Sequence, residues 1–277
     1  MSNYPKKLYY MIDILCNEKC TKCHHWKQAS QKNVDNMSKV IGYINDLEYL
    51  EDFVIVGGEP LIYRSEILEI INGIKNPNIR TTIITNGVLA NHEFIDALVS
   101  KNVHLVFSID TLDEKEWIFV RGKNTLEIVM TNFYYAQEKL NPIQISVQSV
   151  LALETEQSIK KVGEWLSTMG VYHSIQQYIS SGFDGEWHSV KESEIDATRN
   201  ISCIANEINM SIMPNGDVYT CFQQNLIPQC EQSIGNIKHN SAKEILKMPY
   251  LESVRNKMKF CNLPCKVLKC NIGDNNE

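Results

Sequence analysis

The stretch "DILCNEKCTKCHHW", residues 13–26, places three cysteines close together directly after an apolar run. Cys16, Cys20 and Cys23 have the spacing C-x3-C-x2-C, and the chain holds nine cysteines in 277 residues. A chain of this length builds a substantial core without disulfides, so stability alone does not explain the cysteines. An odd number of cysteines in two groups predicts metal ligation or thiol chemistry rather than disulfide bonds.

Charge and hydropathy narrow the class of protein. The formal net charge is −6 and the pI is about 5.7, so no overall basic field attracts a nucleic acid. The N-terminus has no sustained apolar segment, and no apolar run approaches the length that crosses a membrane. We therefore predict a cytoplasmic protein without a nucleic-acid or membrane partner, which acts on a small polar metabolite or a peptide.

Residues 8–178 alternate between short β-branched or aromatic runs and longer amphipathic segments, a pattern typical of βα units with a parallel sheet. The predicted strands are 8–14, 52–56, 80–85, 103–109, 143–150 and 171–177. The predicted helices are 35–50, 64–75, 91–100, 124–139 and 155–168. Six such units predict an α/β fold with a partial (β/α)6 barrel of the TIM type. A six-stranded doubly wound sheet is the alternative.

The sequence changes after residue 178. A Gly- and Ser-rich stretch, "SSGFDGEWHS" at 180–189, indicates a boundary, so we predict a barrel at 1–180, a linker at 181–202 and a small α+β domain at 203–277. Within this domain, Asn215-Gly216 predicts a β-hairpin turn. Residues 241–258 predict a helix that is interrupted near Pro249.

The predicted strands bring several polar segments to one rim. In a βα barrel the loops at the carboxyl ends of the strands converge, so residues that follow different strands become neighbours. The cysteine triplet follows the first strand, and "GGEP" (57–60), "TNG" (85–87) and "SID" (108–110) follow the next three. We expect a ligand pocket at this rim.

Three cysteine ligands suit a [4Fe–4S] cluster with one iron left for another ligand, because clusters that only carry electrons take four. With this motif, the chain resembles the radical S-adenosylmethionine (SAM) superfamily. The resemblance implies that the cluster binds SAM and cleaves it reductively to a 5′-deoxyadenosyl radical, with an electron from an external reductant such as flavodoxin or ferredoxin. A structural zinc site with a remote fourth ligand is the alternative for Cys16, Cys20 and Cys23.

The resemblance also implies roles in the loop after the second strand. Gly57, Gly58 and Glu59 match the glycine-rich motif whose backbone and carboxylate meet the amino group of SAM. Glycine suits a position where the backbone approaches a ligand closely. The chain departs from the family at Lys22, where other members usually carry an aromatic residue before the third cysteine.

Five further residues are candidate SAM contacts. In similar SPASM/Twitch members, the positions of Ser108 and Arg121 contact the SAM carboxylate, and a guanidinium fork suits that group well. Thr85, Asn86 and Asp110 are predicted near the ribose hydroxyls, although Asn86 also suits a simple turn.

A second metal site is predicted near the C-terminus. Cys203 and Cys221 follow the pattern C-x12-G-x4-C, and the tail "FCNLPCKVLKC" adds Cys261, Cys265 and Cys270. This arrangement resembles SPASM and Twitch domains, which hold auxiliary iron–sulfur clusters. We favour a Twitch domain with one auxiliary cluster of the [4Fe–4S] type, held by Cys203, Cys221, Cys265 and Cys270, with Cys261 as the substitute ligand. A structural zinc is again the alternative.

These features predict a radical SAM oxidoreductase of dehydrogenase or epimerase type. The substrate we favour is a small polar, sugar- or aminocyclitol-like metabolite, as for 2-deoxy-scyllo-inosamine dehydrogenase, because no peptide-recognition segment is expected before the first strand. A maturase of ribosomally made peptides and, from another class, a zinc-dependent binding module are the alternatives. Cys230 is a candidate hydrogen-atom donor, and no catalytic base is assigned.

Overall fold

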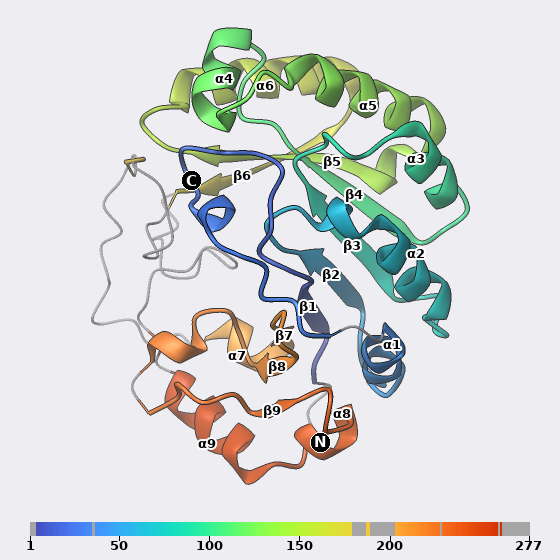
Figure 1. Ribbon diagram of the computed structural model, residues 1–277, viewed down its shortest axis with the longest axis vertical. Coiled ribbons are helices and arrows are strands. Elements are labelled where there is room, and N and C mark those ends of the chain that lie inside the picture. Colours follow the sequence, from blue (N-terminus) through green and yellow to red (C-terminus); the bar gives the residue numbers. More distant parts are fainter. Residues whose placement is uncertain are drawn as a thin grey trace.

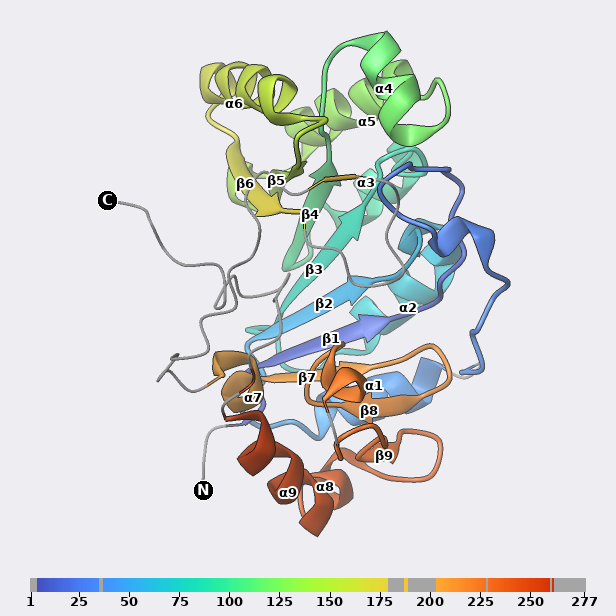
Figure 2. The ribbon, with the colours of Figure 1, turned by 90° about the vertical axis from the view of Figure 1, so that its left-hand side faces the viewer.

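The computed structural model describes residues 4–34, 37–178, 187–188, 203–227, 229–259 and 261. Within these residues the strands form one sheet in the order β6-β5-β4-β3-β2-β1-β7-β8-β9 (Figure 2). The strands are β1 (Lys7–Met11), β2 (Asp52–Val56), β3 (Arg80–Thr85), β4 (Val103–Ser108), β5 (Ile145–Leu151), β6 (Tyr172–Gln177), β7 (Asn209–Ile212), β8 (Asp217–Tyr219) and β9 (Gly235–Asn236).

Strands β1 to β6 are parallel, as the βα pattern predicts. The helices between them lie along the outer side of the curved sheet, which confirms a partial barrel (Figure 1). They are α1 (Met37–Asn45), α2 (Arg64–Gly73), α3 (His92–Leu98), α4 (Glu114–Arg121), α5 (Leu126–Lys139) and α6 (Glu156–Met169). Short 3-10 turns are η1 (His25–Lys27), η2 (Pro60–Tyr63), η3 (Pro142–Gln144) and η4 (Gln224–Leu226).

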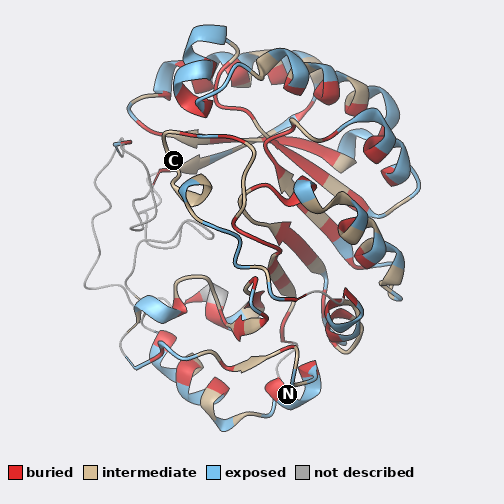
Figure 3. Cartoon of the chain, viewed as in Figure 1, coloured by how far each residue is buried: buried red, intermediate tan, exposed pale blue. Residues whose placement is uncertain are grey.

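The alternation of side chains along the strands places the core between the sheet and these helices. Leu8, Tyr10, Phe53, Ile55 and Phe107 are fully buried there, at every second position of their strands (Figure 3). The remaining positions of the same strands face the inner side of the barrel. The sheet therefore has one apolar face that carries stability and one face available to a ligand.

Helix α4 is absent from the sequence prediction. It begins where the side chain of Asp113 accepts hydrogen bonds from the backbone N–H of Lys115 and Glu116, and it ends at Gly122 in the left-handed region (φ 69°). Ile118 and Phe119 are exposed, so the apolar stripe that normally reveals a helix is weak. Only the two end signals indicate this helix.

The predicted hairpin at Asn215-Gly216 is confirmed by β7 and β8, which pair antiparallel, with Gly216 at φ 90°. Unexpectedly, β7 also pairs in parallel with β1, so the hairpin extends the barrel sheet (Figure 2). The Tyr4 hydroxyl strengthens this edge by donating to the Asn209 carbonyl over 2.6 Å. Helix α7 (Ile204–Ile208) precedes the hairpin.

The predicted interruption near Pro249 is confirmed, because α8 (Ala242–Ile245) and α9 (Pro249–Met258) are separate helices. The division into 1–180, 181–202 and 203–277 stays a prediction, since most of residues 179–202 lies outside the described chain. In the described ranges, every helix is too short or too polar to cross a membrane.

Candidate functional site

The segment that carries the three N-terminal cysteines, residues 13–31, is named the cysteine loop. It begins and ends on the carboxylate of Asp13, which accepts hydrogen bonds from the backbone N–H of Ile14 (2.7 Å) and Gln31 (2.9 Å). The hydroxyls of Ser30 (2.6 Å) and Tyr63 also donate to it. Burial alone raises the pKa of Asp13, but these donors outweigh it and hold the pKa below its usual value.

A second support comes from the end of α4. The backbone N–H of Lys19 donates to the Arg121 carbonyl, and that of Thr21 donates to the Val120 carbonyl, both over 3.0 Å. A Cβ at Gly122 would lie 2.5 Å from the Lys19 carbonyl oxygen, so this approach requires glycine. The cysteine loop is thus fixed to two separate elements of the barrel.

N–H donors point toward two of the three sulfurs. The Arg121 Nη1 lies 3.9 Å from the Sγ of Cys20, and the Asn86 Nδ2 lies 3.9 Å from the Sγ of Cys16. The third cysteine follows in the same turn, with the Cys23 N–H donating to the Cys20 carbonyl over 3.2 Å. Burial raises the pKa of the Cys16 thiol to about 12, so its thiolate needs a cation such as iron.

The arrangement of the cysteine side chains bears on whether the loop could hold a cluster or a single metal ion. In the described part of the chain, no three His, Cys, Asp or Glu side chains converge on one point as a zinc ion requires. A cuboidal cluster instead binds each thiolate to a different iron, so its ligands need not converge. The three thiolates of the cysteine loop, each bound to a different iron, fit an iron–sulfur cluster.

The two glycines after β2 have a structural reason of their own. A Cβ at Gly57 would lie 2.3 Å from the Asp13 carbonyl oxygen, and one at Gly58 would lie 2.2 Å from that of Leu15. The Gly58 N–H donates to the backbone carbonyl of Asp13 (2.9 Å), and the Glu59 N–H donates to the backbone carbonyl of Leu15 (2.8 Å). The glycines thus let the cysteine loop pack directly against the end of β2, in addition to any approach to a ligand.

The Glu59 carboxylate is buried and engaged by the protein itself. It accepts from the Thr85 hydroxyl (2.7 Å) and from the backbone N–H of Leu61 (2.9 Å) and Asn86 (2.7 Å). Burial raises the pKa of Glu59 to about 7 against the effect of these donors. Thr85, a predicted ribose contact, also accepts from the Gly87 N–H (3.0 Å), so both side chains hold the rim in shape.

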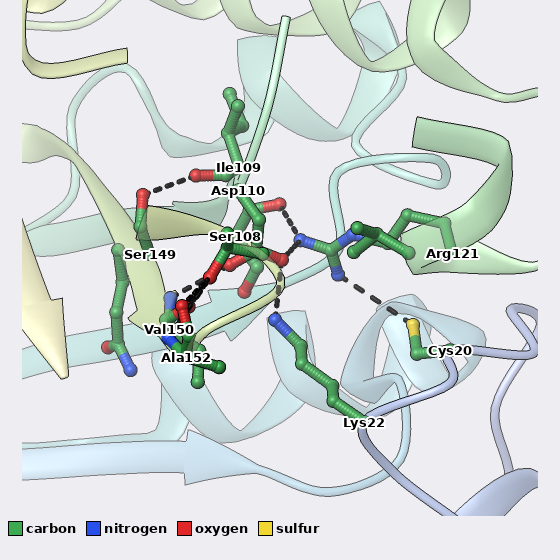
Figure 4. Close-up of polar contacts among 12 residues, drawn as sticks. Cys20, Lys22, Ser108, Ile109, Asp110, Arg121, Ser149, Val150 and Ala152 are labelled. Carbon is green, nitrogen blue, oxygen red and sulfur yellow. Dashed lines mark hydrogen bonds and ion pairs between the residues drawn. The ribbon is translucent and has the colours of Figure 1, made fainter. Parts of the chain in front are cut away.

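The strongest charge cluster of the rim lies around Asp110 (Figure 4). Its Oδ2 lies 2.5 Å from the Lys22 Nζ and 2.8 Å from the Arg121 Nη2, and its Oδ1 accepts from the Val150 N–H over 2.8 Å. Burial alone raises the pKa of Asp110, but Lys22 and Arg121 outweigh it and hold the pKa below its usual value. Lys22 thus binds the very residue predicted to face the ribose.

The remaining predicted SAM contacts are brought to the same place. Arg121 Nη2 donates to the carbonyl of Ser108 over 2.5 Å, so Ser108 contributes its backbone to the network. The Nε of Arg121 is buried and has no hydrogen-bond partner in the described residues. These SAM-binding roles stay predictions, although the geometry collects the residues at one rim.

Several residues around this rim were missed at the level of sequence. Asn17 and Glu18 lie inside the cysteine motif. Asn17 accepts a hydrogen bond from Asn86 Nδ2 (2.7 Å), and Glu18 accepts one from the Thr125 hydroxyl (2.9 Å). Glu18 is buried, and burial raises its pKa. A carboxylate in a loop normally indicates solvent exposure, so only its position between two cysteines signalled a role.

The C-terminal cysteine group comprises Cys203, Cys221, Cys230 and Cys261. The Cys203 N–H donates to the Lys259 carbonyl (3.1 Å) and the Cys261 N–H to the Met258 carbonyl (3.0 Å), so both meet the end of α9. Cys221 packs against the apolar cluster formed by Cys230, Val254 and Met258. The other two predicted ligands, Cys265 and Cys270, lie outside the described residues.

Cys230 is fully buried in this cluster. A hydrogen-atom donor must contact the substrate radical, and this position offers no such contact in the described structure. The role of Cys230 as a donor stays a prediction without structural support. None of the cysteines in the described residues forms a disulfide.

The partial barrel with its cysteine loop defines a class of iron–sulfur proteins, and comparison with known families identifies it. Residues 14–166, more than half of the chain, match the model of the radical SAM superfamily, and residues 203–271 match the SPASM iron–sulfur cluster-binding domain. The chain belongs to the radical SAM superfamily. Its cofactors are the [4Fe–4S] cluster that binds SAM, SAM itself and an auxiliary iron–sulfur cluster.

Individual relatives are more distant. A probable GTP 3′,8-cyclase of Pyrococcus horikoshii is 28% identical over 139 residues, which span 48% of this chain and 43% of the cyclase. Streptococcus suis SuiB bound to S-adenosylmethionine has a TM-score of 0.77 at 17% identity, over 95% of this chain and 73% of SuiB. BtrN, solved with AdoMet and 2-DOIA, has a TM-score of 0.55 at 14% identity, over 94% of this chain and 89% of BtrN.

Proposed function

We propose that the chain is a radical SAM oxidoreductase whose N-terminal cluster is held by Cys16, Cys20 and Cys23. When bound, the cluster and SAM supply a 5′-deoxyadenosyl radical that abstracts a hydrogen atom from the substrate. The protein holds the cysteine loop on Asp13 and on the end of α4, and Arg121 Nη1 faces one of the sulfurs. This fixed loop with three cysteines is the observation that carries the proposal.

Cys16→Ala tests this assignment. We expect loss of reductive SAM cleavage, measured as 5′-deoxyadenosine formed under anaerobic conditions with dithionite, and loss of about four irons per chain. The Lys27→Ala variant is the matched control, because it changes an exposed polar side chain of the same loop without removing a proposed ligand or a contact to Asp13. A Cys16→Ala protein that cleaves SAM at the wild-type rate would refute the proposal.

For the substrate we propose a small polar metabolite, sugar- or aminocyclitol-like, which the enzyme oxidises or epimerises. The inner face of β4 to β6 supports this class because it is lined by polar groups. Gln148 of β5 donates to Gln176 of β6 over 2.7 Å. Such paired polar side chains match hydroxyl and amino groups of a substrate better than an apolar one.

A peptide is the second candidate, favoured by the match to SuiB, which has also been solved with the precursor peptide SuiA bound. Amide side chains on the inner face suit peptide bonds equally well. A panel of aminocyclitols, sugars and short peptides, assayed for substrate-dependent 5′-deoxyadenosine, separates the two. Stimulation by peptides alone would overturn the metabolite proposal.

The electron source we propose is a flavodoxin or ferredoxin, and the auxiliary cluster is proposed to accept the electron when the substrate radical is oxidised. We place the enzyme in the cytoplasm, where thiol ligands stay reduced. Reconstitution with purified flavodoxin in place of dithionite tests the electron source by the same product assay.

A further inference from the structure

Lys22 lies inside the cysteine motif, between Cys20 and Cys23. Its side chain extends from the cysteine loop to the residue that follows the end of β4. Its Nζ lies 2.5 Å from the Oδ2 of Asp110, which follows β4, and only 13% of the side chain is exposed (Figure 4). The ammonium also lies 5.3 Å from the centre of the Trp187 ring. The aromatic ring and the carboxylate thus enclose the charge at a fixed place beside the cysteines.

This ion pair belongs to a buried group of charges. Asp110 is 0% exposed and shares its Oδ2 between Lys22 and Arg121, whose Nη1 reaches the sulfur of Cys20. Glu18 and Glu59 are further buried carboxylates near Arg121. Carboxylates thus outnumber the cations Lys22 and Arg121 in this group, and the loss of Lys22 would remove one of the two positive charges.

Salt screens the interaction between buried charges only weakly, so the buried charges of this group act on a cluster bound by the neighbouring cysteines. Three thiolates and a cluster carry net negative charge, and reduction adds one electron more. A fixed positive charge therefore stabilises the reduced form relative to the oxidised form, as net charge is one of the factors that set cluster potentials. The Lys22 ammonium satisfies this condition because Asp110 holds it in place.

We propose that Lys22 is a positioning residue that makes the N-terminal cluster easier to reduce, through the charge that it adds to the Asp110–Arg121 network, which reaches the sulfur of Cys20. The inference rests on the proposed function, in which these cysteines carry the cluster. Other members usually carry an aromatic residue before the third cysteine. In this chain, Lys22 supplies a positive charge and an ion pair at that position.

The test compares Lys22→Met, which keeps the length of the side chain and removes the charge, with Lys22→Arg, which keeps the charge. The midpoint potential of the N-terminal cluster is measured by redox titration monitored by electron paramagnetic resonance, in anaerobic holoenzyme with its full iron content. For Lys22→Met we expect the equilibrium constant for one-electron reduction to fall about tenfold, which corresponds to about 59 mV more negative. Lys22→Arg should stay within about threefold of wild type.

If Lys22→Met does not assemble the cluster, Lys22→Gln is measured in its place, with the same expected shift. A neutral variant within threefold of wild type would overturn the inference, and so would a Lys22→Arg shift as large as that of Lys22→Met. Failure of the proposed function is a different result: wild-type protein would then show no reducible N-terminal cluster and no SAM cleavage. A wild-type enzyme that cleaves SAM while the variants show no shift refutes the inference alone.

Discussion

The cysteine loop and the C-terminal cysteine group hold their sulfurs in different ways. The loop is fixed by buried, directional polar contacts, above all those of Asp13 and of the Asp110 network. In the C-terminal group, the backbone N–H groups of Cys203 and Cys261 donate to the end of α9, and Cys221 and Cys230 pack against the apolar side chains of Val254 and Met258. Directional contacts fix the orientation of a ligand set, which matters where one iron must stay open to SAM, whereas apolar packing mainly supplies stability.

The largest expected effect separates the two regions by function. Cys20→Ala should abolish SAM cleavage, whereas Cys221→Ala should spare it and stop formation of the oxidised product. Each variant should lose about half of the iron, because each loses one of two clusters. The measurements are iron per chain and 5′-deoxyadenosine with and without substrate. Normal product formation by Cys221→Ala would show that the second cluster has no redox role.

The next prediction concerns the polar support of the loop. Asp110→Asn leaves the Lys22 and Arg121 cations buried without their anion, and breaking such a pair costs about 3–5 kcal/mol of unfolding free energy. The matched control is Asp52→Asn, which removes the carboxylate of a surface pair with Arg80, whose side chain is 53% exposed, and should cost at most about 1 kcal/mol. Denaturant unfolding in the absence of SAM measures both. Equal losses would mean that the Asp110 network is no more than a surface ion pair.

Backbone contact between the loop and β2 gives the third test. Gly58→Ala places a Cβ 2.2 Å from the Leu15 carbonyl oxygen, so we expect the loop to shift, with about 2–4 kcal/mol of destabilisation and weaker SAM binding. Gly42→Ala is the control, because Gly42 is an exposed position of helix α1 where a Cβ would meet no atom within 4 Å, and the change should stabilise by about 0.5–1 kcal/mol. Calorimetry of SAM binding and thermal unfolding provide the two readouts. If Gly58→Ala bound SAM normally, close backbone packing between β2 and the cysteine loop would not be required for the site.

The smallest expected effect is a dependence of stability on pH. Burial raises the pKa of Glu59 from 4.5 to about 7, so its contribution is fully present below about pH 4.5 and is lost as pH rises through 7. Wild-type protein should therefore lose on the order of 2 kcal/mol between about pH 5 and pH 8 from this group, and Glu59→Gln should lose less. Urea unfolding across this range, without SAM, measures the two slopes. Parallel slopes would show that Glu59 has an ordinary pKa.

Local patterns in the sequence are sufficient for the six barrel strands, the hairpin at Asn215-Gly216 and the cysteine motif. Spacing, turn residues and β-branched runs are all properties of neighbours in the chain. Strand β1 ends at Met11 rather than at residue 14, because Asp13 leaves the sheet to close the cysteine loop. No pattern of neighbouring residues shows that Asp13 binds the end of the cysteine loop.

The contacts that the sequence did not predict join distant residues. The Lys22–Asp110 pair spans 88 positions, and the pairing of β7 with β1 spans about two hundred. A lysine in a polar loop is usually solvated, and a two-strand hairpin beyond a boundary is usually a separate unit. In both cases the decisive partner is set by the three-dimensional closure of the barrel, which is why sequence patterns did not indicate it.

The pairing of β7 with β1 also has a consequence for biosynthesis. β1 leaves the ribosome about two hundred residues before residues 209–212, which cover its second edge. Until then the nascent chain presents an unpaired strand edge, the kind of surface on which other chains aggregate. Pairing of β1 on both edges, which supports the base of the cysteine loop, is thus expected only after residues 209–212 have emerged, so iron should be inserted after that point.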